Sequence, residues 1–574
     1  DCLLSRGLGD VYKRQGYGTS QNGDLYRYDK ISGYYQSIAP QPLDSKSSLR
    51  FNWNSGFAED PFNSKGVYYG SQYVHKSQDK GSNWEIISPD LTTNNPEYQK
   101  ADYGGLTLDV SGAENYTSIL SIAPSTLNQK IIWVGTDDGQ IQLTQDGGTT
   151  WKNLTTKVEG LPEESWVARI HASRFHEGTA WAVVNNYRKG DYAPYLFKTS
   201  DYGENWTSMV SEKDVKGYSL SFIQDPKEKK LLFLGTENGL WVSINEGQDW
   251  VQVKNGFPSV STMDLKIQEK ESALVIGTFG RAIWVLDDLL SLREIITINS
   301  DQKLIPLSLN KVIQVKGLFI APPGNIWTGF YTTFEGKNRV FQKVRIPFFL
   351  NDKPTALDSV TAVIQNSKMQ TINTVVEKNL EKGLNYVTWK LDEKKITLPG
   401  SWINEESRGI PVLPGKYKAK IRYQDQTKTT SIEVVADPRF EIEDEVDQAL
   451  YGFQKQVDKQ VKRLTFLLEE LDGFEQMIKD SSSSKKSELK KKKELLTELK
   501  SIQLKGRDKI DDRQIGAWQS RKITPHALMR RAVKVSKARL SIPSDQDWKL
   551  LKQAELLINT FEKEVKRFKS KLKI

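Results

Sequence analysis

Four acidic or amide side chains recur at one fixed position of a short repeated pattern, and carboxylates in register are the first place to look for acid–base chemistry. In each copy a hydroxyl residue is followed by Asp or Asn two residues later, by Gly after two more, and by Trp after another three. The acid or amide and the Trp of the copies are Asp79 and Trp84, Asp146 and Trp151, Asp201 and Trp206, and Asn245 and Trp250.

The residue types in this pattern favour a structural role over a catalytic one. A short Asp or Asn side chain accepts hydrogen bonds from nearby backbone N–H groups and closes a tight turn. Gly supplies the positive φ that such a turn needs, and Trp buries a large apolar area beneath the hairpin. We therefore predict that the four repeats lock turns and that their carboxylates are not catalytic acids.

Other acids of the chain are the candidates for catalysis. Glu114 lies in a long insert between two expected strands, and Asp138 lies in a Gly-containing hairpin. Glycoside hydrolysis needs two carboxyl groups that face each other across a sugar, about 5 or 6.5–9.5 Å apart. The sequence identifies no such pair and no trio of arginines of the sialidase kind, so no catalytic residue is assigned.

Loop aromatics with neighbouring arginines point instead to binding. Exposed Trp and Tyr rings stack on sugars or on extended peptides, and guanidinium groups bind polar groups of the same ligand. The predicted ligand-binding residues are Trp53, Tyr116, Trp166, Arg169, Arg188 and Arg281.

Composition limits the partners and cofactors. The chain has one cysteine, Cys2, and four histidines without metal-ligand spacing, so we expect neither a metal nor another cofactor. Residues 437–574 hold 32 of the 81 Lys+Arg and 23 of the 72 Asp+Glu, which leaves 49 of each sign in the rest of the chain. The preceding domains are therefore neutral overall, which argues against a nucleic-acid partner. No segment approaches the roughly 20 apolar residues of a membrane-spanning helix.

The elements that must position these residues read as repeated antiparallel hairpins. Before the second box, residues 132–143 form an apolar run, a turn at Gly139 and a second apolar run, and the pattern returns around Gly239 and Gly280. Such units predict about six blades of a β-propeller over residues 16–290.

Two further domains are expected after the blades. Residues 291–436 alternate apolar and polar positions, as in the lysine-rich run from Gly415 to Tyr423, and this predicts an immunoglobulin-like β-sandwich. Residues 437–574 carry apolar stripes at helical spacing and predict a helical bundle or coiled coil, a possible surface for a protein partner. The predicted fold class is thus mainly β, with a carboxy-terminal helical part.

The first 15 residues read differently from the rest. Their codons can be written as a transposon-end adapter used in sequencing, so residues 1–15 are interpreted as a non-native scar. On this interpretation the natural protein carries further blades and a signal peptide upstream.

The boxes and several accompanying phrases resemble a known family. The phrases include Arg50 to Trp53, Trp133 to Gly139 and Gly280 to Asp288, and together they are similar to bacterial BNR (Asp-box) repeat proteins related to the sortilin amino-terminal domain, often described as glycosyl hydrolases. The resemblance implies a secreted, periplasmic or cell-surface protein that binds a polysaccharide or a peptide, or serves as a sorting scaffold. The alternative is a glycoside hydrolase, related to xyloglucanases or sialidases, whose full site needs missing amino-terminal blades.

Overall fold

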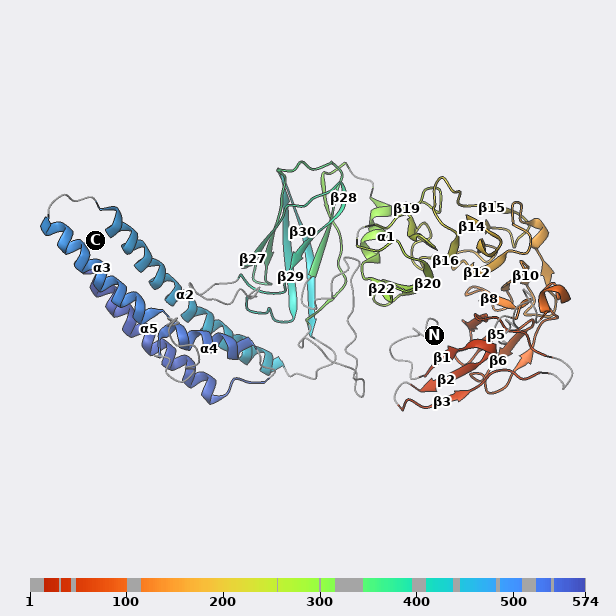
Figure 1. The fold of residues 1–574 in the computed structure, drawn as a ribbon, viewed down its shortest axis with the longest axis horizontal. Coiled ribbons are helices and arrows are strands. Elements are labelled where there is room, and N and C mark those ends of the chain that lie inside the picture. Colours follow the sequence, from red (N-terminus) through yellow and green to blue (C-terminus); the bar gives the residue numbers. More distant parts are fainter. Residues whose placement is uncertain are drawn as a thin grey trace, which may run out of the picture. The chain divides into compact units, whose positions relative to one another are not determined.

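The computed structural model describes the chain between residues 15 and 572 (Figure 1). Residues outside the description are 1–14, 30–31, 43–47, 101–114, 255, 299–300, 315–343, 395–408, 437–443, 482–485, 508–522, 538–540 and 573–574. The chain divides near residue 300 into two compact units, which are described separately. The predicted fold class is confirmed: the chain is mainly β, with helices at its carboxy-terminal end.

The described residues of the first unit form six consecutive antiparallel sheets, the blades of the propeller. The first two sheets are β1 (Gln15–Thr19), β2 (Leu25–Asp29) and β3 (Tyr35–Ser37), then β4 (Phe57–Glu59), β5 (Val67–Gly70), β6 (Val74–Ser77) and β7 (Glu85–Ile86). The next two are β8 (Ile119–Pro124), β9 (Ile132–Thr136), β10 (Ile141–Thr144) and β11 (Lys152–Asn153), then β12 (Trp166–Ala172), β13 (Ala180–Asn186), β14 (Asp191–Thr199) and β15 (Trp206–Ser208). The last two are β16 (Ser219–Gln224), β17 (Leu232–Thr236), β18 (Gly239–Ser243) and β19 (Val251–Gln252), then β20 (Thr262–Gln268), β21 (Ala273–Thr278) and β22 (Ile283–Leu286), followed by α1 (Leu289–Thr297).

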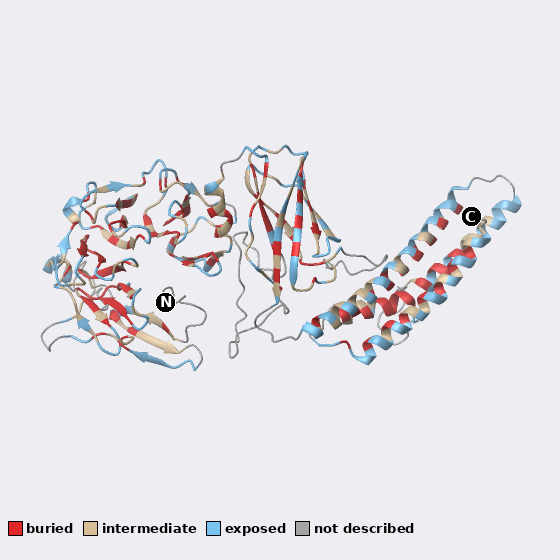
Figure 2. Cartoon of the chain, turned by 180° about the vertical axis from the view of Figure 1, so that it is seen from behind, coloured by how far each residue is buried: buried red, intermediate tan, exposed pale blue. Residues whose placement is uncertain are grey.

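Neighbouring blades share their cores, which explains the uninterrupted apolar runs. Every residue of β9 and of β17 is buried, because each of these strands is covered on both faces by adjacent sheets. Trp133 of β9 packs in one cluster with Val167 and Phe197 of the next blade. Figure 2 shows buried residues throughout the middle of these sheets.

Strand order fixes which loops share a face of the propeller. In a four-stranded antiparallel sheet, the segment before the first strand and the hairpin between the second and third lie at the same end. The register agrees, since Ile119 at the start of β8 pairs with Thr136 at the end of β9, and Trp166 at the start of β12 pairs with Asn185. We call this end the binding face. The Asp boxes join third and fourth strands and therefore lie at the opposite end.

The second unit begins with a β-sandwich. One sheet contains β23 (Leu304–Pro306), β25 (Val344–Leu350) and β28 (Gly383–Trp389). The other contains, in spatial order, β24 (Val312–Gln314), β30 (Gln426–Ala436), β29 (Gly415–Tyr423), β26 (Val360–Gln365) and β27 (Thr371–Glu377). Both sheets contribute alternate residues to one core, including Phe348, Trp389 and Ile421.

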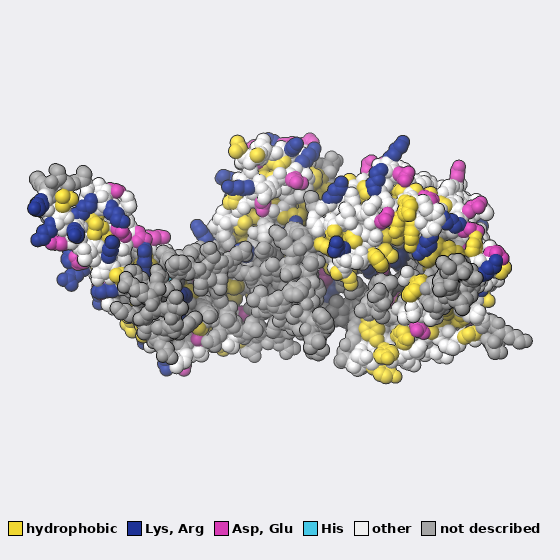
Figure 3. Space-filling view, viewed as in Figure 1, with side chains coloured by type: hydrophobic (Ala, Val, Ile, Leu, Met, Phe, Trp, Pro, Cys, Tyr) yellow, Lys and Arg dark blue, Asp and Glu magenta, His cyan; other side chains and the backbone are white. Residues whose placement is uncertain are grey.

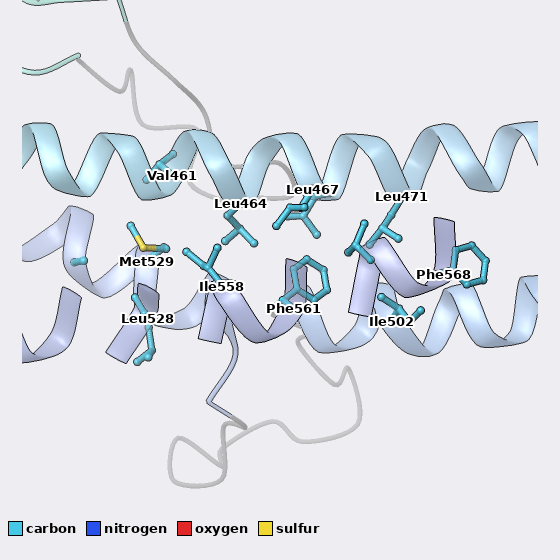
Figure 4. Close-up of a cluster of buried hydrophobic side chains, with 14 of the residues drawn as sticks. Val461, Leu464, Leu467, Leu471, Ile502, Leu528, Met529, Ile558, Phe561 and Phe568 are labelled. Atoms are coloured by element: carbon cyan, nitrogen blue, oxygen red, sulfur yellow. The ribbon is translucent and has the colours of Figure 1, made fainter. Parts of the chain in front are cut away.

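Helices complete the second unit. They are α2 (Asp444–Asp480), α3 (Lys486–Gly506), α4 (Pro525–Lys537) and α5 (Asp545–Lys571). Their apolar stripes meet in one core, where Leu464 of α2, Met529 of α4 and Phe561 of α5 point toward one another (Figure 4). The start of α5 is held by a capping box between Ser544 and Asp547. No helix among the described residues is long and apolar enough to cross a membrane.

Candidate functional site

The Asp boxes form closed turns on the face opposite the binding face. In the second box, Asp146 accepts hydrogen bonds from the backbone N–H of Thr150 at 2.8 Å and from its hydroxyl at 2.7 Å. The hydroxyl of Thr144 accepts from the N–H of Gly148 at 2.9 Å, and this glycine has φ +103°. The carboxylate thus accepts from the N–H group four residues ahead, and the hydroxyl of the first box residue accepts from the N–H of the glycine.

These hydrogen bonds fix the charge of the box carboxylates. Bonds from the side chain and backbone of the residue four positions ahead lower the pKa of Asp79 and of Asp146 to about 2. The pKa of Asp201 is lowered for the same reason. The three carboxylates are therefore ionised at neutral pH and hold no proton that could be donated to a substrate.

Three of the box tryptophans tie successive blades together. The indole N–H of Trp84 donates to the carbonyl of Ile38, and that of Trp151 to the carbonyl of Ile87, both in the preceding blade. Trp250 reaches the carbonyl of Met209 at 3.1 Å in the same way. The indole of Trp206 instead bonds Gly203 of its own box.

The binding face carries a continuous row of rings and one guanidinium. We call these side chains the aromatic row. In order of contact they are Tyr98, Tyr116, Trp166, Arg188, Tyr187, Tyr218 and Tyr192. The indole N–H of Trp166 donates to the hydroxyl of Tyr116 at 2.7 Å, and the rings of Tyr187 and Tyr218 stack with centroids 4.3 Å apart. The row crosses from the third blade to the fifth, and its residues lie in the loops that share this face or at the strand ends next to them.

Arg188 links the two halves of the row. Its guanidinium carbon lies 3.2 Å from the ring centroid of Trp166 and 4.4 Å from that of Tyr187. The rings remove water from the faces of the guanidinium, which lowers the pKa of Arg188 although the residue keeps exposed surface. Stacking covers the two faces of the guanidinium and leaves the N–H groups at its edge uncovered. No acceptor for these N–H groups is found among the described residues.

Two buried acids lie in the hairpin between β9 and β10. Asp137 accepts from the amide of Asn52 at 2.8 Å and from the backbone N–H and hydroxyl of Ser118, each at 2.8 Å. Burial nevertheless raises the pKa of Asp137 to about 7. The adjacent Asp138 is also buried and accepts from the N–H and hydroxyl of Thr93, both at 2.7 Å. In this arrangement both acids brace the loops of the binding face and present no free surface to a ligand.

The remaining predicted residues lie in different surroundings. Trp53 is 52% exposed and follows Asn52, the partner of Asp137. Arg169 forms an ion pair with Asp264 of β20, and Arg281 is exposed in the hairpin before β22. Glu114 lies outside the described residues.

Sequence reasoning missed the contacts that Tyr98, Tyr218 and Asn52 make. Tyr218 immediately precedes β16, and Trp166 begins β12. Because both residues lie at the start of the first strand of a blade, the place of Tyr218 in its blade could have indicated that it shares the face with Trp166. The part of the chain that the structure describes holds no group of three or more His, Cys, Asp or Glu arranged to bind a metal.

Comparisons with known proteins give structural likeness only. No family model matches the chain, and no curated protein matches it. An ancestral GH74 enzyme is 14% identical, with 68% of this chain and 47% of that chain covered and a TM-score of 0.31. The chain therefore spans about half the length of that enzyme.

Two further solved structures complete this comparison. The GH74 enzyme of Niastella koreensis is 15% identical, with 74% of this chain and 72% of that chain covered and a TM-score of 0.29. YCF48 from Cyanidioschyzon merolae is 13% identical, with 48% and 79% covered and a TM-score of 0.32. At these sequence identities and TM-scores, the activities of the three proteins are not assigned to this chain. The propeller is established by the strand pairing of the chain itself.

Proposed function

We propose that the propeller is a binding module whose ligand, a glycan or an extended peptide, lies along the aromatic row. The observation that supports this most directly is the row itself, which places seven side chains from three blades in unbroken contact on one face. Aromatic rings offer apolar area at a low entropic cost, and sugars and extended peptides use such surfaces.

Arg188 gives this surface a polar anchor. The edge of its guanidinium presents N–H donors beside Trp166 and Tyr187, where a ligand oxygen can accept a charge-assisted hydrogen bond. Tyr192, which is 57% exposed at one end of the row, and Trp53, which is 52% exposed on the same face, extend the contact area. The proposal includes a secreted, periplasmic or cell-surface location, where such ligands occur.

The test is a direct binding measurement on an array of oligosaccharides and 12-residue peptides. Tyr192→Ala removes an exposed ring without opening the core and is expected to weaken binding roughly fivefold, the effect of losing about 1 kcal/mol of ring contact. Trp166→Ala breaks the row in the middle and is expected to weaken binding further.

The matched control is Phe175→Ala. Phe175 is 42% exposed, but it lies in the loop between β12 and β13, on the opposite face. Its removal should leave affinity unchanged. Equal losses from Phe175→Ala and Tyr192→Ala would contradict a site on the aromatic row.

A glycoside hydrolase is the second candidate function, and one observation favours it. The pKa of Asp137, raised to about 7, is in the range that a general acid needs. Its two oxygens are bonded to Asn52 and Ser118, so acid catalysis by Asp137 would require the loop before β4 to move. Release of reducing sugar that Asp137→Asn abolishes would establish this alternative.

A further inference from the structure

A row of four positive charges stands on one face of the sandwich. Lys416, Lys418, Lys420 and Arg422 occupy alternate positions of β29 and are all exposed, while the intervening residues point into the core. We call these four residues the basic column. Alternate residues of a strand lie roughly 6.8 Å apart, so the column extends over about 20 Å.

The neighbours of the basic column are almost all uncharged. On β30 the partners of Lys418, Lys420 and Arg422 are Ser431, Thr429 and Thr427. On β26 the partners of the same residues are Gln365, Val363 and Thr361. Among the described strand partners of the column the one acid is Glu433, opposite Lys416, and Lys311 already pairs with it at 3.0 Å.

The four cations have no partner within the part of the chain that the structure describes. Opposite charges across strands stabilise a sheet and like charges weaken it, so an ordinary solvated face mixes both signs. Lysines also protect the open edges of sheets, but β29 is the middle strand of five and has no open edge. Neither general reason explains four like charges on this strand.

We infer that this face of the sandwich binds a linear acidic polysaccharide, with its carboxylate or sulfate groups along the basic column. Charge complementarity favours a regularly charged polyanion, and the short hydroxyl side chains beside the column leave the cations accessible from above. They also offer hydrogen bonds to sugar hydroxyls.

Other polyanions fit the face less well. Single-stranded nucleic acids bind where aromatic rings stack on the bases, and the strand partners of the column include no aromatic residue. A membrane surface would require apolar side chains that insert beside the charges, and among those partners only Val363 is apolar. This site is separate from the aromatic row and does not depend on the function proposed for it.

The experiment uses the full chain and polygalacturonate as the probe, with dextran as the uncharged polymer. Lys418→Glu combined with Lys420→Glu is expected to weaken binding of polygalacturonate at least tenfold. Binding by the unmodified chain should also fall as salt is raised, because counterions compete for the same charges. Circular dichroism melting should show that the double variant remains folded, since both side chains are exposed.

The matched control is Lys353→Glu combined with Lys382→Glu, which changes the net charge equally at exposed positions that flank β25 and β28, in the other sheet of the sandwich. Affinity should change less than twofold in this control. Equal losses in the two charge variants would overturn the proposal, as would no binding of polygalacturonate. Equal affinity for a DNA duplex or for vesicles with anionic lipid would also overturn it.

Discussion

Arg169 of β12 donates a hydrogen bond to Asp264 of β20, a residue 95 positions further along the chain. The two strands are the first strands of the fourth and sixth blades, and β16 of the fifth blade lies between them in sequence and packs on both. The ion pair therefore connects alternate blades. A second pair, Arg174 with Glu269 at 2.5 Å, repeats the connection near the other end of the same two strands.

The Arg169 pair should contribute to stability rather than to binding. Its side chains are 23% and 17% exposed, which is between a surface and a buried pair, so Asp264→Ala should lower the free energy of unfolding by about 1–2 kcal/mol. Urea denaturation of both single variants and of the double variant measures the coupling. Since the sequence predicts a ligand contact for Arg169, ligand affinity should be measured on the same proteins. A loss of affinity in Arg169→Ala without a change in stability would favour the ligand role.

The Asp boxes should act as turn locks whose parts can be exchanged. Asp146→Ala leaves the N–H of Thr150 without its acceptor, and the melting temperature should fall while ligand affinity does not change. The fourth box contains the exchanged pair naturally. There the amide of Asn245 donates to the carboxylate of Asp249 at 2.8 Å, and its oxygen accepts from the backbone N–H of Asp249. Asp146→Asn combined with Thr150→Asp copies this arrangement and should recover most of the lost melting temperature. Failure of the copied box to recover any stability would argue against the turn-lock role.

Acid should weaken the boxes in a defined range of pH. The pKa of Asp146 in the folded protein is about 2, below its ordinary value of 3.8, so its contribution to stability is present above pH 4 and is lost as the pH falls toward 2. Comparing the unmodified protein with Asp146→Asn between pH 5 and pH 2 isolates this contribution. The stability difference between the two should shrink as the pH falls, and a constant difference would show that the carboxylate charge is irrelevant.

Asp137 should produce the opposite dependence at higher pH. Its folded-state pKa is about 7 and its unfolded value is near 3.8, so the folded protein binds more protons between these values. Its contribution is fully present below pH 4 and is lost as the pH rises through 7. Asp137→Asn removes the titration, and combining it with Asn52→Asp reverses the donor and acceptor of the hydrogen bond between the two residues. Urea midpoints at pH 5, 6, 7 and 8 should fall less steeply in Asp137→Asn, and an unchanged slope would contradict the raised pKa.

The sequence predicted most accurately what is decided within a few neighbouring residues. The turn at Asp146 depends on residues at most four apart, so the pattern contains the whole interaction. Tyr116, Trp166 and Arg188 were predicted to bind ligand because they lie in or next to loops. The sequence did not predict the order in which these side chains contact one another. That order depends on how three blades pack and on the side-chain conformations of residues up to 72 positions apart (188 − 116). The pairing of Arg169 with Asp264 depends on strands of two non-adjacent blades, and no local pattern contains it.

The last prediction separates binding from glycoside hydrolysis. The two acids described in the binding-face hairpin, Asp137 and Asp138, are buried and fully bonded, whereas the rings of the aromatic row form a continuous surface. We therefore expect saturable binding without release of reducing sugar over a panel of plant, algal and host glycans. Glu114→Gln should leave the affinity unchanged, and Trp53→Ala should reduce it, because Trp53 is an exposed ring on the same face. Release of sugar that disappears in Glu114→Gln would instead make that residue a catalytic acid and the propeller a glycosidase. Isothermal titration of the same variants compares binding with turnover, since the loss of a catalytic acid would abolish turnover while the substrate still binds.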